Sequence, residues 1–90
     1  MLPSDHDEQD LRRKARAALD LGRIPAVRPN GLWGGHGSAD MCPVCGHSID
    51  AAEMELEIEF AADDAQGTRE FHLHLPCFAA WEIERKAASQ

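Results

Sequence analysis

Two short pairs of potential metal ligands constrain the fold of this chain more than any other feature. In the stretch MCPVCGH, Cys42 and Cys45 flank two residues, and Gly46 lets the backbone fold back so that both sulfurs point at one ion. Further along the chain, His74 and Cys77 form a second pair with HxxC spacing. Three sulfurs and one imidazole in two pairs match a closed, tetrahedral Cys3His site. We therefore predict a structural zinc ion held by these four side chains.

A redox role for the cysteine pair is the main alternative, with Cys77 as an ordinary buried cysteine. A thioredoxin-type CxxC pair opens a helix that follows a strand. Here a charged, alternating segment follows Cys45 instead, which is typical of a strand. The pattern therefore favours metal binding over redox chemistry.

The remaining histidines compete with His74 to different degrees. His72 lies two residues earlier on the same strand face, although its HxxxxC spacing to Cys77 is less natural. We expect it to lie against the glutamates of the neighbouring strand, where a carboxylate would favour its charged form. His47, directly after the cysteine knuckle, is a weaker candidate. The histidines expected to be solvated are His36 and His6.

The length and the N-terminal composition limit what kind of protein this is. A chain of 90 residues makes one small domain that buries only about 60 to 65% of its unfolded surface, so a metal would help to stabilise it. The first eleven residues carry four acids and no apolar run, which predicts that there is no signal peptide. Three cysteines cannot all pair with one another. We expect a cytoplasmic protein with reduced thiols.

The N-terminal part predicts a helix followed by an irregular segment. Over residues 4–22, Ser4 is a suitable cap, and Gly22 followed by a proline ends the helical pattern. Residues 25–41 are rich in proline and glycine and are expected to be irregular. Trp33 is the bulky anchor there, and we expect Trp33 and Trp81 to fill the core rather than to stack on bases. The apolar stripe of the helix consists of Leu11, Ala15, Ala18 and Leu19.

The C-terminal half changes to a two-residue period. In EMELEIEF and TREFHLHL, apolar residues alternate with polar ones, which is typical of strands with one buried and one wet face. The loop AADDAQG joins them, so we predict an antiparallel hairpin whose apolar faces coincide. Pro76 then opens a helix to about residue 88, with Phe78 and Trp81 turned inward. The predicted buried strand residues are Met54, Leu56, Ile58, Phe60, Phe71, Leu73 and Leu75.

Together these elements predict a small, zinc-stabilised α+β domain. We expect an N-terminal helix within residues 1–24 and a Gly/Pro-rich connecting segment over residues 25–41. Residues 42–88 would then form the Cys3His zinc-finger domain, built from a zinc knuckle, an antiparallel β-hairpin and a C-terminal helix.

The run from Cys42 to Phe78 resembles the zinc finger of poly(ADP-ribose) polymerase type, which has a treble-clef-like architecture. CxxC, HxxC and the terminal phenylalanine carry the resemblance, together with Ile49 after the knuckle, Gly67 in the hairpin turn and Phe71 before HxxC. The whole chain also resembles small, uncharacterised bacterial zinc-binding proteins with a GLWGG-like stretch before the finger. The resemblance implies zinc bound by Cys42, Cys45, His74 and Cys77, and recognition of DNA breaks. The acidic strand here departs from that family, because carboxylates repel phosphate.

Charge is divided unevenly along the chain. Residues 11–30 hold six basic residues against one acid, whereas residues 31–84 hold eleven acids against Arg69. We therefore expect a zinc-stabilised adaptor that binds another protein in regulation, through its acidic hairpin or its Gly and Trp segment. The alternative is a nucleic-acid binder that uses the basic segment from Arg12 to Arg28, which the overall charge of −7 disfavours.

An enzyme is not expected, because a complete Cys3His set leaves no open position for water on the metal. The glutamates beside the predicted site fit a solvated strand face at least as well as a general base. No apolar run approaches the roughly 20 residues that span a bilayer, so no membrane is predicted. The sequence does not predict the oligomeric state.

Overall fold

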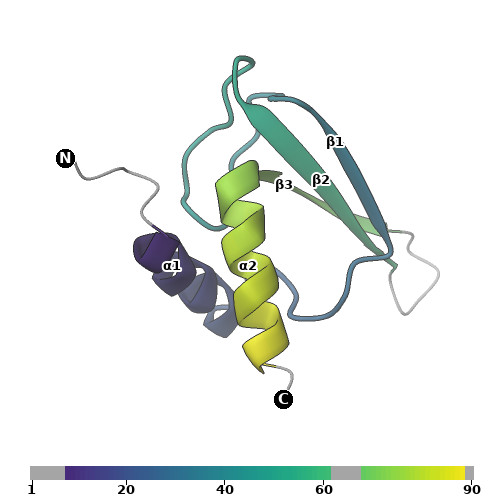
Figure 1. Cartoon of the computed structure of the whole chain (residues 1–90). Coiled ribbons are helices and arrows are strands. Elements are labelled where there is room, and N and C mark those ends of the chain that lie inside the picture. Colours follow the sequence, from purple (N-terminus) through teal and green to yellow (C-terminus); the bar gives the residue numbers. More distant parts are fainter. Residues whose placement is uncertain (1–7, 62–67, 89–90) are drawn as a thin grey trace.

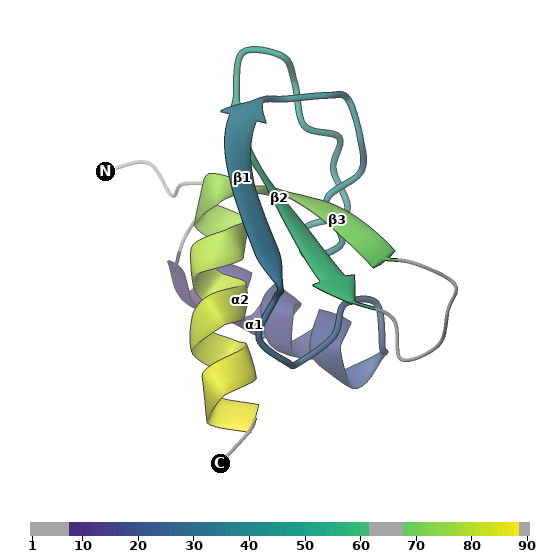
Figure 2. The same cartoon turned by 90° about the vertical axis from the view of Figure 1, so that its right-hand side faces the viewer.

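The computed structural model describes residues 8–61 and 68–88. Helix α2 lies between helix α1 and the sheet, so the molecule has three layers (Figure 1). Seen after a quarter turn, the strands lie in the order β1-β2-β3 with both helices behind them (Figure 2). The predicted α+β class is confirmed. The elements are α1 (Glu8–Asp20), β1 (Gly31–His36), β2 (Met54–Ala61), β3 (Thr68–His74) and α2 (Leu75–Ala88).

Helix α1 packs its narrow apolar stripe against α2 and ends at a glycine. Gly22 has φ +72°, a left-handed conformation that glycine adopts without strain. The backbone N–H of Arg23 donates to the carbonyl of Ala18 at 2.9 Å, which closes a Schellman motif. The predicted helix and its end are confirmed, whereas the predicted start at Ser4 lies outside the described residues. The buried side chains of α1 are Leu11, Ala15 and Ala18.

Strand β1 differs from the expectation that residues 25–41 are irregular. It pairs antiparallel with β2, with Leu32 opposite Ile58 and Trp33 opposite Glu57. Backbone pairing needs no side chain, so a glycine-rich segment can satisfy the free edge of β2 despite its low strand propensity. The pairing decides where Trp33 lies, because residues opposite each other point to the same face.

Trp33 is 52% exposed, so the expectation that it fills the core is wrong. Its register places it on the face of the sheet that carries Glu55, Glu57 and Glu59, which we call the glutamate face. This face points away from the helices. The indole lies over Gly31, where any added Cβ would collide with the ring. Glycine at that position therefore lets the tryptophan lie flat along the strand.

The opposite face of the sheet forms the core with α2. Ile58 lies opposite Phe71 in the hairpin of β2 and β3, and Trp81 of α2 is fully buried against this face. The predicted hairpin and the inward Trp81 are confirmed, while the hairpin loop lies outside the described residues. The predicted burial of Met54 and Leu75 is wrong: Met54, the first residue of β2, is 54% exposed, and Leu75, the first residue of α2, is 48% exposed.

Helix α2 also ties the N-terminal segment to the core. It begins at Leu75, so Pro76 stands in the first turn, where its missing N–H costs no hydrogen bond. The indole N–H of Trp81 donates to the carbonyl of Pro25 at 3.0 Å. The chain after α1 is thereby fixed to the middle of α2.

Candidate metal centre

The cysteine knuckle is shaped by two backbone hydrogen bonds. The N–H of Gly46 donates to the carbonyl of Cys42 at 2.9 Å, and the N–H of Cys42 donates to the carbonyl of His47 at 3.0 Å. Gly46 has φ +79°, which a residue with a side chain adopts only with strain. This tight turn brings the side chains of Cys42 and Cys45 to the same side of the loop, as the sequence predicts.

The second pair of predicted ligands meets the knuckle at the junction of strand and helix. His74 is the last residue of β3, and Cys77 lies in the first turn of α2. The ligand atoms of Cys42, Cys45, His74 and Cys77 all lie within 4.8 Å of one another. The structure therefore brings all four predicted ligands close enough together to hold a metal ion.

The imidazole of His74 presents its two nitrogens to different partners. Nδ1 lies 3.4 Å from Sγ of Cys45 and 4.0 Å from Sγ of Cys77, so this nitrogen faces the sulfurs. Nε2 lies 3.3 Å from Oε1 of Glu53. A carboxylate behind a metal-binding imidazole fixes the ring orientation and raises its basicity. Nδ1 is therefore the nitrogen placed to hold a metal ion.

Glu53 is a positioning residue that sequence reasoning missed, because it was assigned to the solvated glutamate row. Its Oε1 also accepts the backbone N–H of Asp50 at 2.9 Å, and its own N–H donates to the Asp50 carbonyl. Glu53 thus joins the loop after the knuckle to His74. Its place directly before a strand that pairs with β3 is the sequence signal that points to this role.

The pKa values of the three thiols favour one thiolate rather than three. The hydrogen bond from Cys77 lowers the pKa of Cys42 to about 4, and the same contact raises the pKa of Cys77. Burial raises the pKa of Cys45, and the charge of Cys42 raises it further. Burial lowers the pKa of His74, but the hydrogen bond with Cys42 and the carboxylate of Glu53 outweigh it and raise the pKa overall. A cation at the centre would stabilise all three thiolates together.

His72 does not join this cluster of sulfurs. Its Nδ1 lies 2.7 Å from Oε2 of Glu55 on the neighbouring strand, which confirms the expected contact with the glutamate row. Burial lowers the pKa of His72, but the hydrogen bond and charge of Glu55 outweigh it and raise the pKa. His36 is exposed as expected, His47 is exposed and lies outside the group of four, and His6 lies outside the described residues.

Glu55 is buried, although its strand face was predicted to be wet. Its residue exposure is 7%, because the loop after β1 covers it. Ser38 donates to Oε1 of Glu55 through its backbone N–H at 3.0 Å and its hydroxyl at 2.7 Å. Burial raises the pKa of Glu55, but the hydrogen bonds from Ser38 and His72 outweigh it and lower the pKa.

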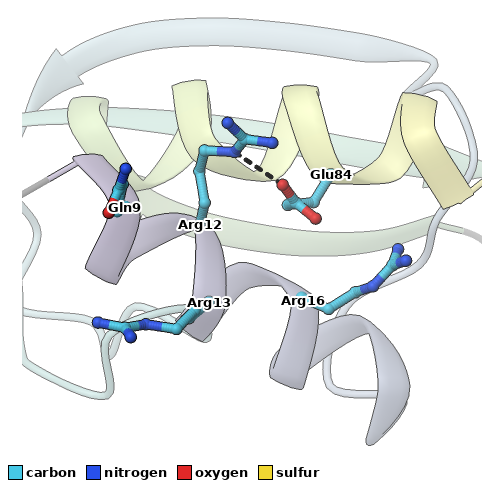
Figure 3. Close-up of a pocket in the computed structure, with 5 residues that line it drawn as sticks. All are labelled: Gln9, Arg12, Arg13, Arg16 and Glu84. Atoms are coloured by element: carbon cyan, nitrogen blue, oxygen red, sulfur yellow. Dashed lines mark hydrogen bonds and ion pairs between the residues drawn. The ribbon is translucent and has the colours of Figure 1, made fainter.

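The basic residues of α1 lie on the far side of the molecule from the sheet. A groove between α1 and α2 is lined by arginines that point in different directions (Figure 3). Arg12 reaches across to Glu84 of α2, with 2.8 Å between Nε and Oε2. Arg13 and Lys14 both approach Asp10 on their own helix, at 3.4 Å and 3.2 Å. Much of the basic charge is therefore balanced by carboxylates of the same protein.

Comparison of the chain with models of protein families, with curated proteins and with solved structures finds no match. The resemblance of the run from Cys42 to Phe78 to a poly(ADP-ribose) polymerase-type finger therefore stays a prediction. Neither of the two helices described here is long and apolar enough to cross a membrane.

Proposed function

We propose that this protein is a structural zinc-binding module that acts as an adaptor for another protein. The donor set of Cys42, Cys45, His74 and Cys77 supports zinc as the ion, because three thiolates and one imidazole complete a tetrahedral zinc shell. A shell completed by protein leaves no position for a metal-bound water. This argues for a structural role and against an enzyme. Free thiols and a metal site both fit the reducing cytoplasm.

The observation that carries the adaptor role is the face of the sheet that neither helix covers. Both helices lie behind the opposite face (Figure 2), so the glutamate face has no helix over it. Trp33 lies there, half exposed, opposite Glu57. Exposed aromatic residues are enriched at protein interfaces and often carry much of the binding energy. β1 is also an edge strand, which can accept an extended segment of a partner.

The charge of this face defines the partner it would suit. Glu57, Glu59 and Glu70 share one face of the strands with Trp33. A partner rich in lysine or arginine would meet complementary charge there, and its cations would interact favourably with the indole ring. We therefore propose a basic protein segment as the bound partner.

Nucleic-acid binding is the second candidate because Arg12, Arg13 and Arg16 of α1 all line the groove between the two helices (Figure 3). Phosphate contacts by these side chains would require Arg12 to leave Glu84, which is buried. Removing the counter-charge of a buried carboxylate is unfavourable. Binding through this groove is accordingly expected to be weak and sensitive to salt.

Matched surface variants in a pull-down from cell lysate, combined with DNA-binding titrations, test the proposal. We expect a basic protein partner that the wild type and the Arg13→Ala/Arg16→Ala variant both capture, and that Trp33→Ala and Glu57→Lys lose. Duplex DNA binding tighter than micromolar at physiological salt would contradict this. Such binding would fall with salt at a log slope of about −0.9 per phosphate contact and would depend on Arg13 and Arg16.

A further inference from the structure

Strand β1 has one free edge, and the hydrogen-bond ladder decides which backbone groups face it. Among the described strands, β2 is the one neighbour of β1. The N–H of Gly37, directly after β1, donates to the carbonyl of Glu53 at 3.0 Å, which continues the register of the two strands. Antiparallel ladders alternate, so every second residue bonds to β2 and the others turn their backbone groups outward. The outward residues of β1 are therefore Leu32, Gly34 and His36.

Two glycines in the middle of this edge are not required by the fold. Neither Gly34 nor Gly35 has a positive φ. Among the described residues, a Cβ added at Gly35 would meet nothing within 4 Å beyond its chain neighbours, and one at Gly34 would touch Leu56 at 3.5 Å, an ordinary contact. Glycine within a strand costs conformational entropy and marks places where another backbone approaches closely. The two glycines therefore point to a second backbone beside β1.

A hollow lies beside the start of the same strand, on the helix side of the sheet. It has a volume of about 240 Å³ between β1 and α2, with Leu32 and Phe78 in its wall. Arg85 also lines it and is paired with Glu82, and Arg28 is exposed there. Small-molecule pockets hold about 300 to 1,000 Å³, so this hollow suits one apolar side chain better than a whole ligand.

An added antiparallel strand would present its side chains to two different surroundings. Residues opposite Leu32 and Gly34 would bond to β1 and point their side chains to the helix side, where the hollow lies. The residue opposite Trp33 would point to the glutamate face, beside the half-exposed indole. A lysine or arginine there would interact favourably with the ring and with the nearby glutamates. The edge thus suits a segment in which basic and apolar residues alternate.

A second copy of this chain is a poorer occupant than a basic segment. Antiparallel pairing of two β1 strands would continue one sheet through both molecules and set their glutamate faces side by side. Each face carries Glu57, Glu59 and Glu70. Like charges placed together across an interface are unfavourable, whereas a basic segment would meet complementary charge.

We propose that β1 holds its partner by strand addition, as an extended segment in which basic and apolar residues alternate. The segment pairs with the outward backbone groups of β1, places a basic side chain beside Trp33 and fills the hollow beside α2 with an apolar one. This inference rests on the proposed function, because it takes the basic partner from there, and it adds how that partner is held.

A synthetic peptide of about eight residues, in which lysine alternates with valine, tests strand addition on the zinc-loaded full chain. At saturating peptide, the outward N–H groups of Leu32, Gly34 and His36 should exchange with solvent at least about tenfold more slowly. The N–H of Trp33 faces β2 already and should change less than about twofold. N-methylation of the valine amides, which would face β1, should weaken binding at least about tenfold, whereas N-methylation of the lysine amides should weaken it less than about twofold.

Substitution of Gly34 tests the same edge from the side of the protein. Gly34→Pro removes an outward N–H, which a strand edge tolerates because no bond to β2 is lost, and should weaken peptide binding at least about tenfold. Gly34→Ala keeps that N–H and is the matched control, with an expected change of less than about threefold. Zinc content and an NMR spectrum verify that both variants are folded.

Equal effects of the two methylated peptides, or no binding at millimolar concentration, would overturn strand addition. Peptide binding that depends on Trp33 and Glu57 but leaves the outward N–H groups unprotected would also overturn it, while the basic partner would stand. A peptide with glutamine in place of every lysine that binds equally well would instead contradict the basic partner and leave strand addition standing.

Discussion

The metal end and the helical end of this molecule are held together by different forces. At the metal end, meaning the end with the proposed zinc centre, four potential ligands from the knuckle, β3 and the start of α2 come within 4.8 Å of one another. At the helical end, α1 rests on α2 through Leu11 and the small side chains of Ala15 and Ala18, with an ion pair between Arg12 and Glu84. Small residues bury little apolar area, so this contact contributes modestly to stability.

This difference implies that the packing of α1 depends on the metal end, whereas the metal end does not depend on α1. Cys77, one of the four potential ligands, lies in the first turn of α2, and Trp81 follows one turn later at the centre of the core. Helix α1 contacts α2 rather than the sheet. Loss of the metal is therefore expected to loosen α2 first and α1 as a consequence, whereas loss of α1 contacts should leave the metal end intact.

Removal of the metal should have the largest effect. Apparent zinc-binding free energies of about 10 to 16 kcal/mol in zinc-finger peptides equal or exceed the total stability of a small domain. A strong chelator should therefore unfold the chain, with loss of dispersed methyl signals in one-dimensional NMR and of secondary structure in circular dichroism. A metal-free sample that keeps its dispersed methyl signals would contradict the dependence on metal.

Loss of one ligand should have the second-largest effect. His74→Ala removes the nitrogen that faces the sulfurs, whereas His72→Ala leaves all four atoms of the centre in place. With Co²⁺ in the cysteine site, the first substitution should strongly change the visible absorption bands of the tetrahedral thiolate complex, and the second should leave them nearly unchanged. If His72→Ala changed the spectrum more, the fourth ligand would be His72.

Substitution of the two tryptophans separates the core from the surface. Trp81 is fully buried, with its ring 6.1 Å from that of Phe60, so Trp81→Ala should lower the free energy of unfolding by about 3 to 5 kcal/mol. Trp33→Ala should lower it by less than about 1 kcal/mol, because half of that side chain is exposed. Guanidinium chloride unfolding of the zinc-loaded variants measures both values. Similar losses would mean that Trp33 belongs to the core.

The smallest effect should come from the contact between the helices. Arg12→Ala leaves the buried Glu84 without its partner and should cost about 1 kcal/mol, a modest value because Arg12 itself is 45% exposed. Arg13→Ala is the matched control, since Arg13 pairs with Asp10 on its own helix and should change stability by less than about 0.5 kcal/mol. Thermal unfolding compares them, and equal effects would argue against a role for the pair with Glu84.

The features that the sequence predicted are those that depend on local spacing. Residues a few positions apart predict the two ligand pairs and the alternating strands. They also predict the end of α1, which Gly22 marks. They therefore require no knowledge of the tertiary structure.

The features that the sequence did not predict depend on partners that are distant along the chain. β1 forms because β2 has a free edge, which the glycines of β1 do not signal. Glu55 is buried because Ser38 folds over it from another segment. Trp33 is exposed because its register with Glu57 turns it to the face that neither helix covers. Each outcome depends on strand pairing or on burial by another segment, and not on the residue type alone.

X-ray absorption spectroscopy at the zinc edge tests the central claim most directly. With one zinc per chain, the cysteine centre predicts three sulfur neighbours at about 2.3 Å and one nitrogen neighbour at about 2.0 to 2.1 Å. A shell with two or more nitrogen or oxygen neighbours would contradict a closed Cys3His site and, with it, the proposal that zinc stabilises this fold.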